Sequence, residues 1–182
     1  MTRFLLISLS IVALIILVFV VFREPIEEAA YDNITEDMFV EKDNDDFDPG
    51  PALGSRFPGL NGLYDNQPVT LLEPFAGPAG TLFMASRSFE WCPYCMKQMI
   101  ELNRVADRFE SAGIGLVAMT YDSPAVQGQF TSEHGITIPI LADVDTLSFR
   151  TLGILNTEYL PGDDAYGIPY PGMIIVDPAG KV

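Results

Sequence analysis

The chain contains two cysteines, Cys92 and Cys95, within the segment Ser88–Cys95 (SFEWCPYC). An apolar run, Thr81–Ser86, precedes this segment and a helical pattern follows it, so the pair lies where a strand passes into a helix. A thiol at a helix N-terminus faces unpaired N–H groups and the positive end of the helix dipole, and both stabilise a thiolate. Pro93 falls at the first helical position, where its missing N–H costs nothing. The spacing therefore predicts a redox-active pair.

Two other interpretations of the cysteines are a zinc site and a pair of inert core thiols. Zinc needs two further ligands, and the single histidine, His134, is far away in the sequence. A purely structural disulfide is also a poor explanation, because a bridge that closes so small a loop removes little entropy from the unfolded chain. The strand–CxxC–helix context favours the redox pair over all of these.

The formal net charge of −15 is concentrated in one segment. Residues 24–48 carry eleven acidic side chains against Lys42 alone, while residues 49–182 are only moderately acidic. No basic patch is available for a phosphate backbone, so we expect no nucleic-acid partner. We interpret residues 24–50 as an acidic flexible linker.

The N-terminal segment from Phe4 to Phe22 has no charged residue and predicts a membrane anchor in residues 1–23. The rival interpretation, a cleaved signal peptide, has a shorter apolar region and a small-residue cleavage site, whereas Glu27 and Glu28 directly precede Ala29 and Ala30 here. The sparse basic residues and short N-terminal tail favour a single-pass protein with its N-terminus in the cytoplasm. The C-terminal domain, residues 51–182, is then expected outside the cytoplasm, in the periplasm or its equivalent.

Residues 51–182 alternate between short apolar runs and helical patterns, which indicates an α/β domain with a mixed sheet. The expected strands are Leu60–Leu63, Val69–Leu72, Thr81–Ser86, Gly115–Thr120, Ile138–Leu141 and Met173–Asp177. The expected helices are Met96–Ala112, Ser123–His134 and Asp145–Leu152, with Gly113, Gly135 and Gly153 at their ends. Asp65 and Asn66 are expected to turn the first hairpin, and Asp145 to cap the last helix.

Three segments resemble the thioredoxin superfamily, and in particular its alkyl hydroperoxide reductase/thiol-specific antioxidant (redoxin, peroxiredoxin-like) branch. They are FMASRSFEWCPYCMKQM, FTSEHGITIPILADVDTLSFRTLGIL and PYPGMIIVDPAGKV. The resemblance implies a thioredoxin-like fold, with a mixed central sheet flanked by helices, and dithiol or peroxide chemistry. By position, Cys92 matches the attacking cysteine and Cys95 the resolving one. Pro171 matches a proline that is cis in this family and faces the cysteines, where it lets the backbone of Tyr170 pair with an extended substrate.

The sequence departs from the resemblance at three points. Peroxiredoxins carry Pro-x-x-x-Thr-x-x-Cys, whose threonine and a later arginine activate the peroxide, and here Ala85 and Phe89 occupy the proline and threonine positions. No arginine precedes the Met173 strand in the expected place. The family's sheet ends with a further strand and helix, whereas this sequence stops at Val182, so we expect a fold without them, or a fragment.

We therefore expect a membrane-anchored thiol–disulfide oxidoreductase, with a peroxiredoxin-like thiol peroxidase using Cys92 as the alternative. A thioredoxin-like copper chaperone is a weaker interpretation, because His134 comes too early in the fold. Trp91, Pro93 and Tyr94 are expected to form an apolar rim for a substrate, beside Tyr170 and Pro171. The expected partners are protein or small-molecule disulfides, peroxides and a thiol–disulfide redox protein, with no metal and no cofactor beyond the Cys92–Cys95 disulfide.

Overall fold

The computed structural model describes residues 11, 12, 14, 16, 17, 25, 49–143 and 145–182. The chain divides into two compact units, residues 1–43 and residues 44–182. Most of the expected anchor and linker lies outside the described residues. Ile11, Val12, Leu14, Ile16 and Leu17 are helical, and each is more than half exposed. None of the helices among the described residues has the length and apolar character needed to cross a membrane.

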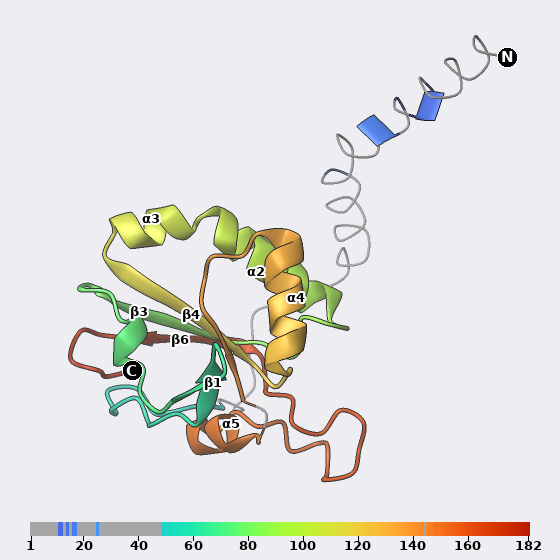
Figure 1. Cartoon of the computed structure of the whole chain (residues 1–182). Coiled ribbons are helices and arrows are strands. Elements are labelled where there is room, and N and C mark those ends of the chain that lie inside the picture. Colours follow the sequence, from blue (N-terminus) through green and yellow to red (C-terminus); the bar gives the residue numbers. More distant parts are fainter. Residues whose placement is uncertain (1–10, 13, 15, 18–24, 26–48, 144) are drawn as a thin grey trace, which may run out of the picture. The chain divides into compact units, whose positions relative to one another are not determined.

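Residues 49–143 and 145–182 fold around a six-stranded mixed sheet with the strand order β2-β1-β5-β4-β3-β6 (Figure 1). The strands are β1 (Gly62–Tyr64), β2 (Gln67–Val69), β3 (Gly80–Ala85), β4 (Ile114–Thr120), β5 (Ile140–Ala142) and β6 (Gly172–Val176). Strand β3, which lies next to the edge strand β6, pairs in parallel with β4 and antiparallel with β6. All six residues of β3 are buried, as expected for a strand covered on both faces.

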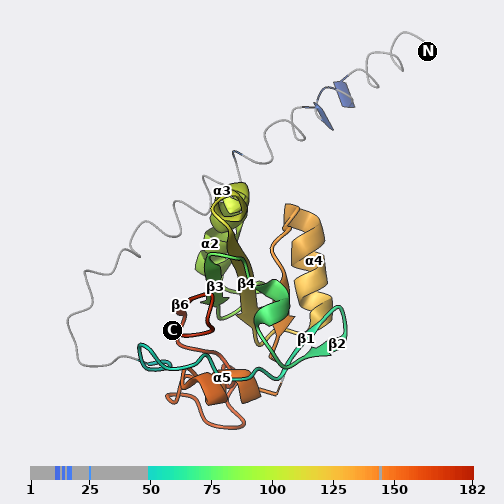
Figure 2. The ribbon, with the colours of Figure 1, turned by 90° about the vertical axis from the view of Figure 1, so that its left-hand side faces the viewer.

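Helices cover both faces of the sheet. The helices are η2 (Glu73–Phe75), α2 (Pro93–Arg104), α3 (Ala106–Ser111), α4 (Pro124–His134) and α5 (Leu147–Leu152). Figures 1 and 2 show α2, α3 and α4 on one face and α5 on the other. The fold is therefore the expected thioredoxin-like α/β fold with a mixed sheet flanked by helices.

Two apolar clusters, one on each face of the sheet, form the core. One cluster contains Phe57, Phe83, Phe149 and Leu152 and lies under α5. The other lies under α2 and α4 and is built from Met84, Met99, Phe130 and both cysteines, with others. The cysteine pair is therefore part of the α2-side core, which fixes its position relative to the sheet.

The structure corrects the expected helices in two places. The helix expected over residues 96–112 is two helices, because Val105 leaves helical geometry and its N–H bonds to the Leu102 carbonyl in a tighter turn. Asp145 does not cap α5. The carboxylate of Asp143 instead accepts the N–H groups of Ser148 and Phe149, at 3.0 and 2.8 Å. Burial of Asp143 raises its pKa, and these two hydrogen bonds only partly offset that effect.

Candidate active site

Cys92 and Cys95 are joined by a disulfide at the N-terminus of α2, with their Cα atoms 5.3 Å apart. Cys92 is the N-cap residue, and its sulfur accepts the N–H of Cys95 at 3.3 Å. Pro93 is the first residue of the helix, as expected. Both cysteines are nearly inaccessible, with 2 % and 4 % of their surfaces exposed. A reduced Cys92 would thus face a helix N-terminus that stabilises its thiolate.

The turn before Cys92 is held by a carboxylate from a distant part of the sequence. Asp122 follows β4, and it accepts the Ser88 hydroxyl and the Phe89 N–H, each at 2.7 Å. The Ser88 oxygen in turn accepts the N–H groups of Glu90 and Trp91, at 3.0 and 3.4 Å. These four donors of the turn therefore have partners inside the protein, as most buried polar groups do.

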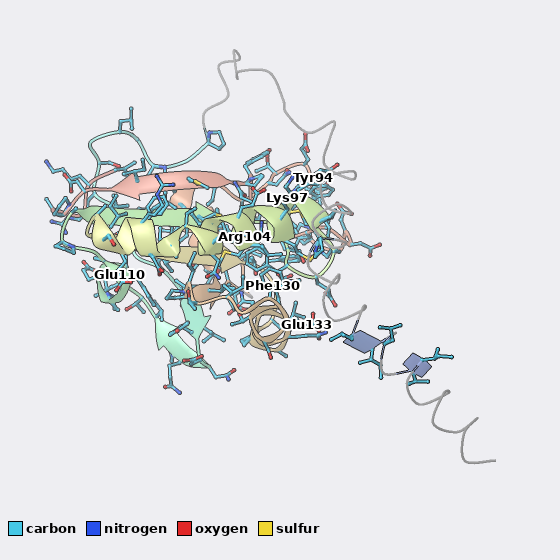
Figure 3. The ribbon with its side chains drawn as sticks, turned by 90° about the horizontal axis from the view of Figure 1, so that it is seen from above. Tyr94, Lys97, Arg104, Glu110, Phe130 and Glu133 are labelled. Carbon is cyan, nitrogen blue, oxygen red and sulfur yellow. A yellow bond between two sulfur atoms is a disulfide. The ribbon has the colours of Figure 1, made fainter. Side chains whose placement is uncertain are left out.

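Aromatic side chains lie on both sides of this turn. The indole N–H of Trp91, a side chain that is 45 % exposed, donates to the Tyr121 hydroxyl at 2.8 Å. The buried Phe89 ring stacks on Phe130 of α4, with centroids 4.7 Å apart and planes 15° apart. Tyr94 is half-buried on the first turn of α2, and Figure 3 shows it at one end of that helix. Trp91 and Tyr94 thus both keep solvent-accessible surface beside the cysteine pair.

The expected cis bond before Pro171 is wrong, because none of the described peptide bonds is cis. The N–H of Tyr170 donates to the Ile154 carbonyl at 2.7 Å, which leaves it unavailable to a substrate. Trans is also the intrinsically favoured form of a bond to proline. Pro171 still lies at the active-site end of the sheet, since the next residue, Gly172, pairs with Ala85 at the end of β3.

Glu90, Lys97 and His134 have ordinary structural positions, whereas the Nε of Arg87 is buried without a hydrogen-bond partner. Glu90 is exposed. The Lys97 Nζ lies 3.9 Å from the Oε1 of Glu101, one helical turn further along α2. His134 ends α4 with its ring centroid 4.8 Å from that of Phe130. Across the part of the chain that the structure describes, no three His, Cys, Asp or Glu side chains are grouped as a metal site.

Sequence reasoning missed the roles of Ser88 and Asp122. The only available signal was position: Asp122 lies two residues beyond the end of β4, which runs parallel to the strand leading to Cys92. Because parallel strands end at the same edge of a sheet, residues that follow neighbouring strands come close together. Asp122 also stood beside Ser123-Pro124, a helix start, which made it resemble an ordinary loop acid.

The thioredoxin-like fold and the Cys92–Cys95 disulfide at a strand–helix junction define a thiol-based oxidoreductase. The profile of the AhpC/TSA family matches residues 54–182, and the chain belongs to this family. Solved structures with the same fold include a peroxiredoxin-like protein from Aquifex aeolicus, with a TM-score of 0.61 and 20 % identity over 74 % of this chain and 75 % of that one. A thiol peroxidase from Chromobacterium violaceum has a TM-score of 0.58 and 25 % identity, and the match covers 73 % of this chain and 74 % of that one.

The curated relatives are matched over only part of their length. A peroxiredoxin of Aeropyrum pernix is 25 % identical over 59 % of this chain and 46 % of its own length. The thiol-disulfide oxidoreductase ResA of Geobacillus thermodenitrificans is 28 % identical over 50 % of this chain and 46 % of its own. The chain thus spans about half the length of these relatives. Most of the curated relatives are named peroxiredoxins.

Proposed function

We propose that the domain is a two-cysteine thiol peroxidase in which Cys92 attacks a hydroperoxide and Cys95 resolves the product. The Cys92 thiolate forms an S–O bond with the terminal peroxide oxygen as the O–O bond breaks, and the leaving alkoxide takes up a proton. The Cys95 thiol then attacks the Cys92 sulfenic acid, which forms the disulfide and releases water. A reduced dithiol would return the two electrons and two protons.

The observation that carries this proposal is the burial of the cysteine pair. Only 2 % of Cys92 and 4 % of Cys95 are exposed, so a small oxidant reaches the sulfur more easily than a disulfide on a folded protein does. The second cysteine is already within bonding distance of the first, so the sulfenic acid needs no rearrangement of the fold to be resolved. The names of most curated relatives support the same assignment.

Thiol–disulfide exchange is the second candidate, and one feature of the site favours it. Peroxide cleavage places negative charge on a leaving oxygen, which needs a positioned donor. Phe89 occupies the family's threonine position, and its buried ring stacks on Phe130 and offers no hydroxyl. Exchange needs less from the site, namely a thiolate, a leaving thiol and access. The ResA relative also supports this candidate.

One kinetic comparison separates the two candidates. The reduced full chain is mixed with hydrogen peroxide, with cumene hydroperoxide or with glutathione disulfide, and the second-order rate of Cys92 oxidation is measured for each. We expect peroxide rates orders of magnitude above those of a free thiol with the same titration midpoint. Peroxide rates at the free-thiol level, together with rapid exchange with glutathione disulfide, would reverse the order of the candidates.

We also propose that residues 1–23 anchor the protein in a membrane and that the redox domain works outside the cytoplasm. The uncharged segment Phe4–Phe22 and the weak basic bias around it support this arrangement. Trp91, Tyr94 and Pro171 are proposed as the rim that a substrate or reductant contacts. Protease added to sealed spheroplasts tests the orientation of the domain. We expect the added protease to cleave residues 51–182, because the proposal places them outside the cytoplasm.

A further inference from the structure

The buried Asp122 carboxylate connects the turn before Cys92 to the centre of the domain. Its residue surface is 6 % exposed, and Ser88, which donates to it, is fully buried. A hydrogen bond from a hydroxyl and one from a backbone N–H converge on its two oxygens, both at 2.7 Å. Contacts to a charged acceptor of this length are among the stronger hydrogen bonds in proteins. The turn from Ser88 to Trp91 is therefore fixed to the end of β4.

The carboxylate itself is held in place from two further elements. The Thr120 hydroxyl donates to the same Asp122 oxygen that accepts the Phe89 N–H, at 2.9 Å. The Gln127 side chain on α4 donates to the Thr120 oxygen and to the Leu141 carbonyl of β5, both at 2.9 Å. These bonds form one network across β4, α4 and β5, and each hydrogen bond limits the freedom of the next.

We propose that Asp122 is a positioning residue for Cys92 and acts through Ser88. The Ser88 oxygen accepts two N–H groups of the turn, so the bond to Asp122 sets where the turn lies and how Cys92 enters α2. That placement aims the Cys95 N–H at the Cys92 sulfur. The inference rests on the proposed role of Cys92 as the attacking thiol, which both candidate functions share. Asp122 and Ser88 themselves touch no reacting atom.

Positioning and charge make opposite predictions for substitutions at this network. A negative charge near the helix N-terminus disfavours a thiolate, so loss of that charge alone would make Cys92 more reactive. Loss of the hydrogen bond between Ser88 and Asp122 alone would misalign the Cys95 N–H with the Cys92 sulfur and make Cys92 less reactive. Asp122→Asn removes the charge and also alters the hydrogen bonds to the turn. Ser88→Ala removes the hydrogen bond between Ser88 and Asp122 but keeps the Asp122 side chain. Both variants are expected to lower Cys92 reactivity if positioning dominates.

A matched control is available at the end of the neighbouring strand. Asp143 is fully buried and accepts two N–H groups at the start of α5. This helix covers the core cluster on the opposite face of the sheet from the cysteines. Asp143→Asn therefore removes a buried carboxylate of similar geometry without touching the Ser88–Trp91 turn. It is expected to affect stability but not the chemistry of Cys92.

The test is alkylation of the reduced full chain by iodoacetamide across a pH series, with cysteine identity read by mass spectrometry. For Ser88→Ala and Asp122→Asn we expect the midpoint of the pH profile of Cys92 alkylation to move up by about one pH unit. At pH values below the midpoint, this shift lowers the alkylation rate about tenfold. Peroxide oxidation of Cys92 should slow to a similar degree. Thermal unfolding of each variant reports folding separately, and Ser88→Ala keeps the test open if Asp122→Asn does not fold.

Three outcomes would overturn the inference. If Cys92 is alkylated faster in Asp122→Asn and at the wild-type rate in Ser88→Ala, then the charge of Asp122 controls Cys92 reactivity. Unchanged profiles in both variants, with stability lost as in Asp143→Asn, would make the network purely structural. Equal changes in all three variants would show a global effect. Failure of the proposed peroxidase activity is distinguishable, because it would leave the alkylation differences intact.

Discussion

Truncation of Phe89 is expected to weaken the fold and the active site together. The ring is 3 % exposed and stacks on Phe130 with centroids 4.7 Å apart. A buried phenylalanine replaced by alanine loses about 3–5 kcal/mol, of which about 0.5–1.5 kcal/mol belongs to the aromatic pair. For a domain of this size, that loss corresponds to a decrease in Tm of roughly 10–25 °C. Because Phe89 lies in the turn before Cys92, Phe89→Ala should also slow Cys92 alkylation.

The matched control for this prediction is Phe57→Ala in the opposite core cluster. Phe57 is 8 % exposed, and its ring centroid is 5.3 Å from that of Phe83. The control should lose a comparable amount of stability and keep the wild-type alkylation rate. Urea unfolding of Phe89→Ala, Phe130→Ala and the double variant gives the coupling energy of the stacked pair. A cost below about 1 kcal/mol for Phe89→Ala, or no coupling to Phe130, would refute the reasoning.

Three further predictions concern the resolving thiol, a buried carboxyl and the N-terminal segment. Peroxide-treated Cys95→Ser should accumulate a Cys92 sulfenic acid that dimedone labels, whereas a mixed disulfide with another protein would favour exchange. Folding raises the pKa of Asp143, mainly through burial, so its stabilising contribution is complete below the unfolded value of about 3.9 and is lost as pH rises through the folded value. Wild type should therefore lose stability relative to Asp143→Asn as the pH of urea titrations rises above about 4, and the opposite slope would contradict the assignment. The full chain should require detergent for extraction from membranes and a variant without residues 1–23 should not, whereas a soluble mature form that begins near residue 30 would refute the anchor.

Local rules predicted most elements of the domain. The turn at Asp65 and Asn66 is confirmed by their φ angles of 48° and 60°, which a tight hairpin requires. Gly135 ends α4 with a φ of 60°, as a left-handed cap does. These features depend on a few neighbouring residues, so sequence alone suffices to find them. The cysteine pair was found for the same reason, because its spacing, Pro93 and the flanking patterns are all local.

Features that depend on distant residues were not predicted. The bonds from the Ser88–Trp91 turn to Asp122 join residues more than 30 positions apart, and no local pattern marks them. Asp143 rather than Asp145 caps α5 because the end of β5 places its carboxylate under the helix, which only the sheet determines. The cis bond at Pro171 was carried over by resemblance, and the backbone around Tyr170 has a different arrangement.

The hydrogen bond between Trp91 and Tyr121 has an optical consequence. Trp91 is the only tryptophan in the chain, it directly precedes Cys92, and the Tyr121 hydroxyl holds its indole N–H at 2.8 Å. Disulfides and thiolates quench indole emission to different extents, so the fluorescence of one fixed chromophore should follow the oxidation state of the neighbouring sulfur. Each turnover of the protein can then be observed without a label, and the amplitude belongs to this site alone.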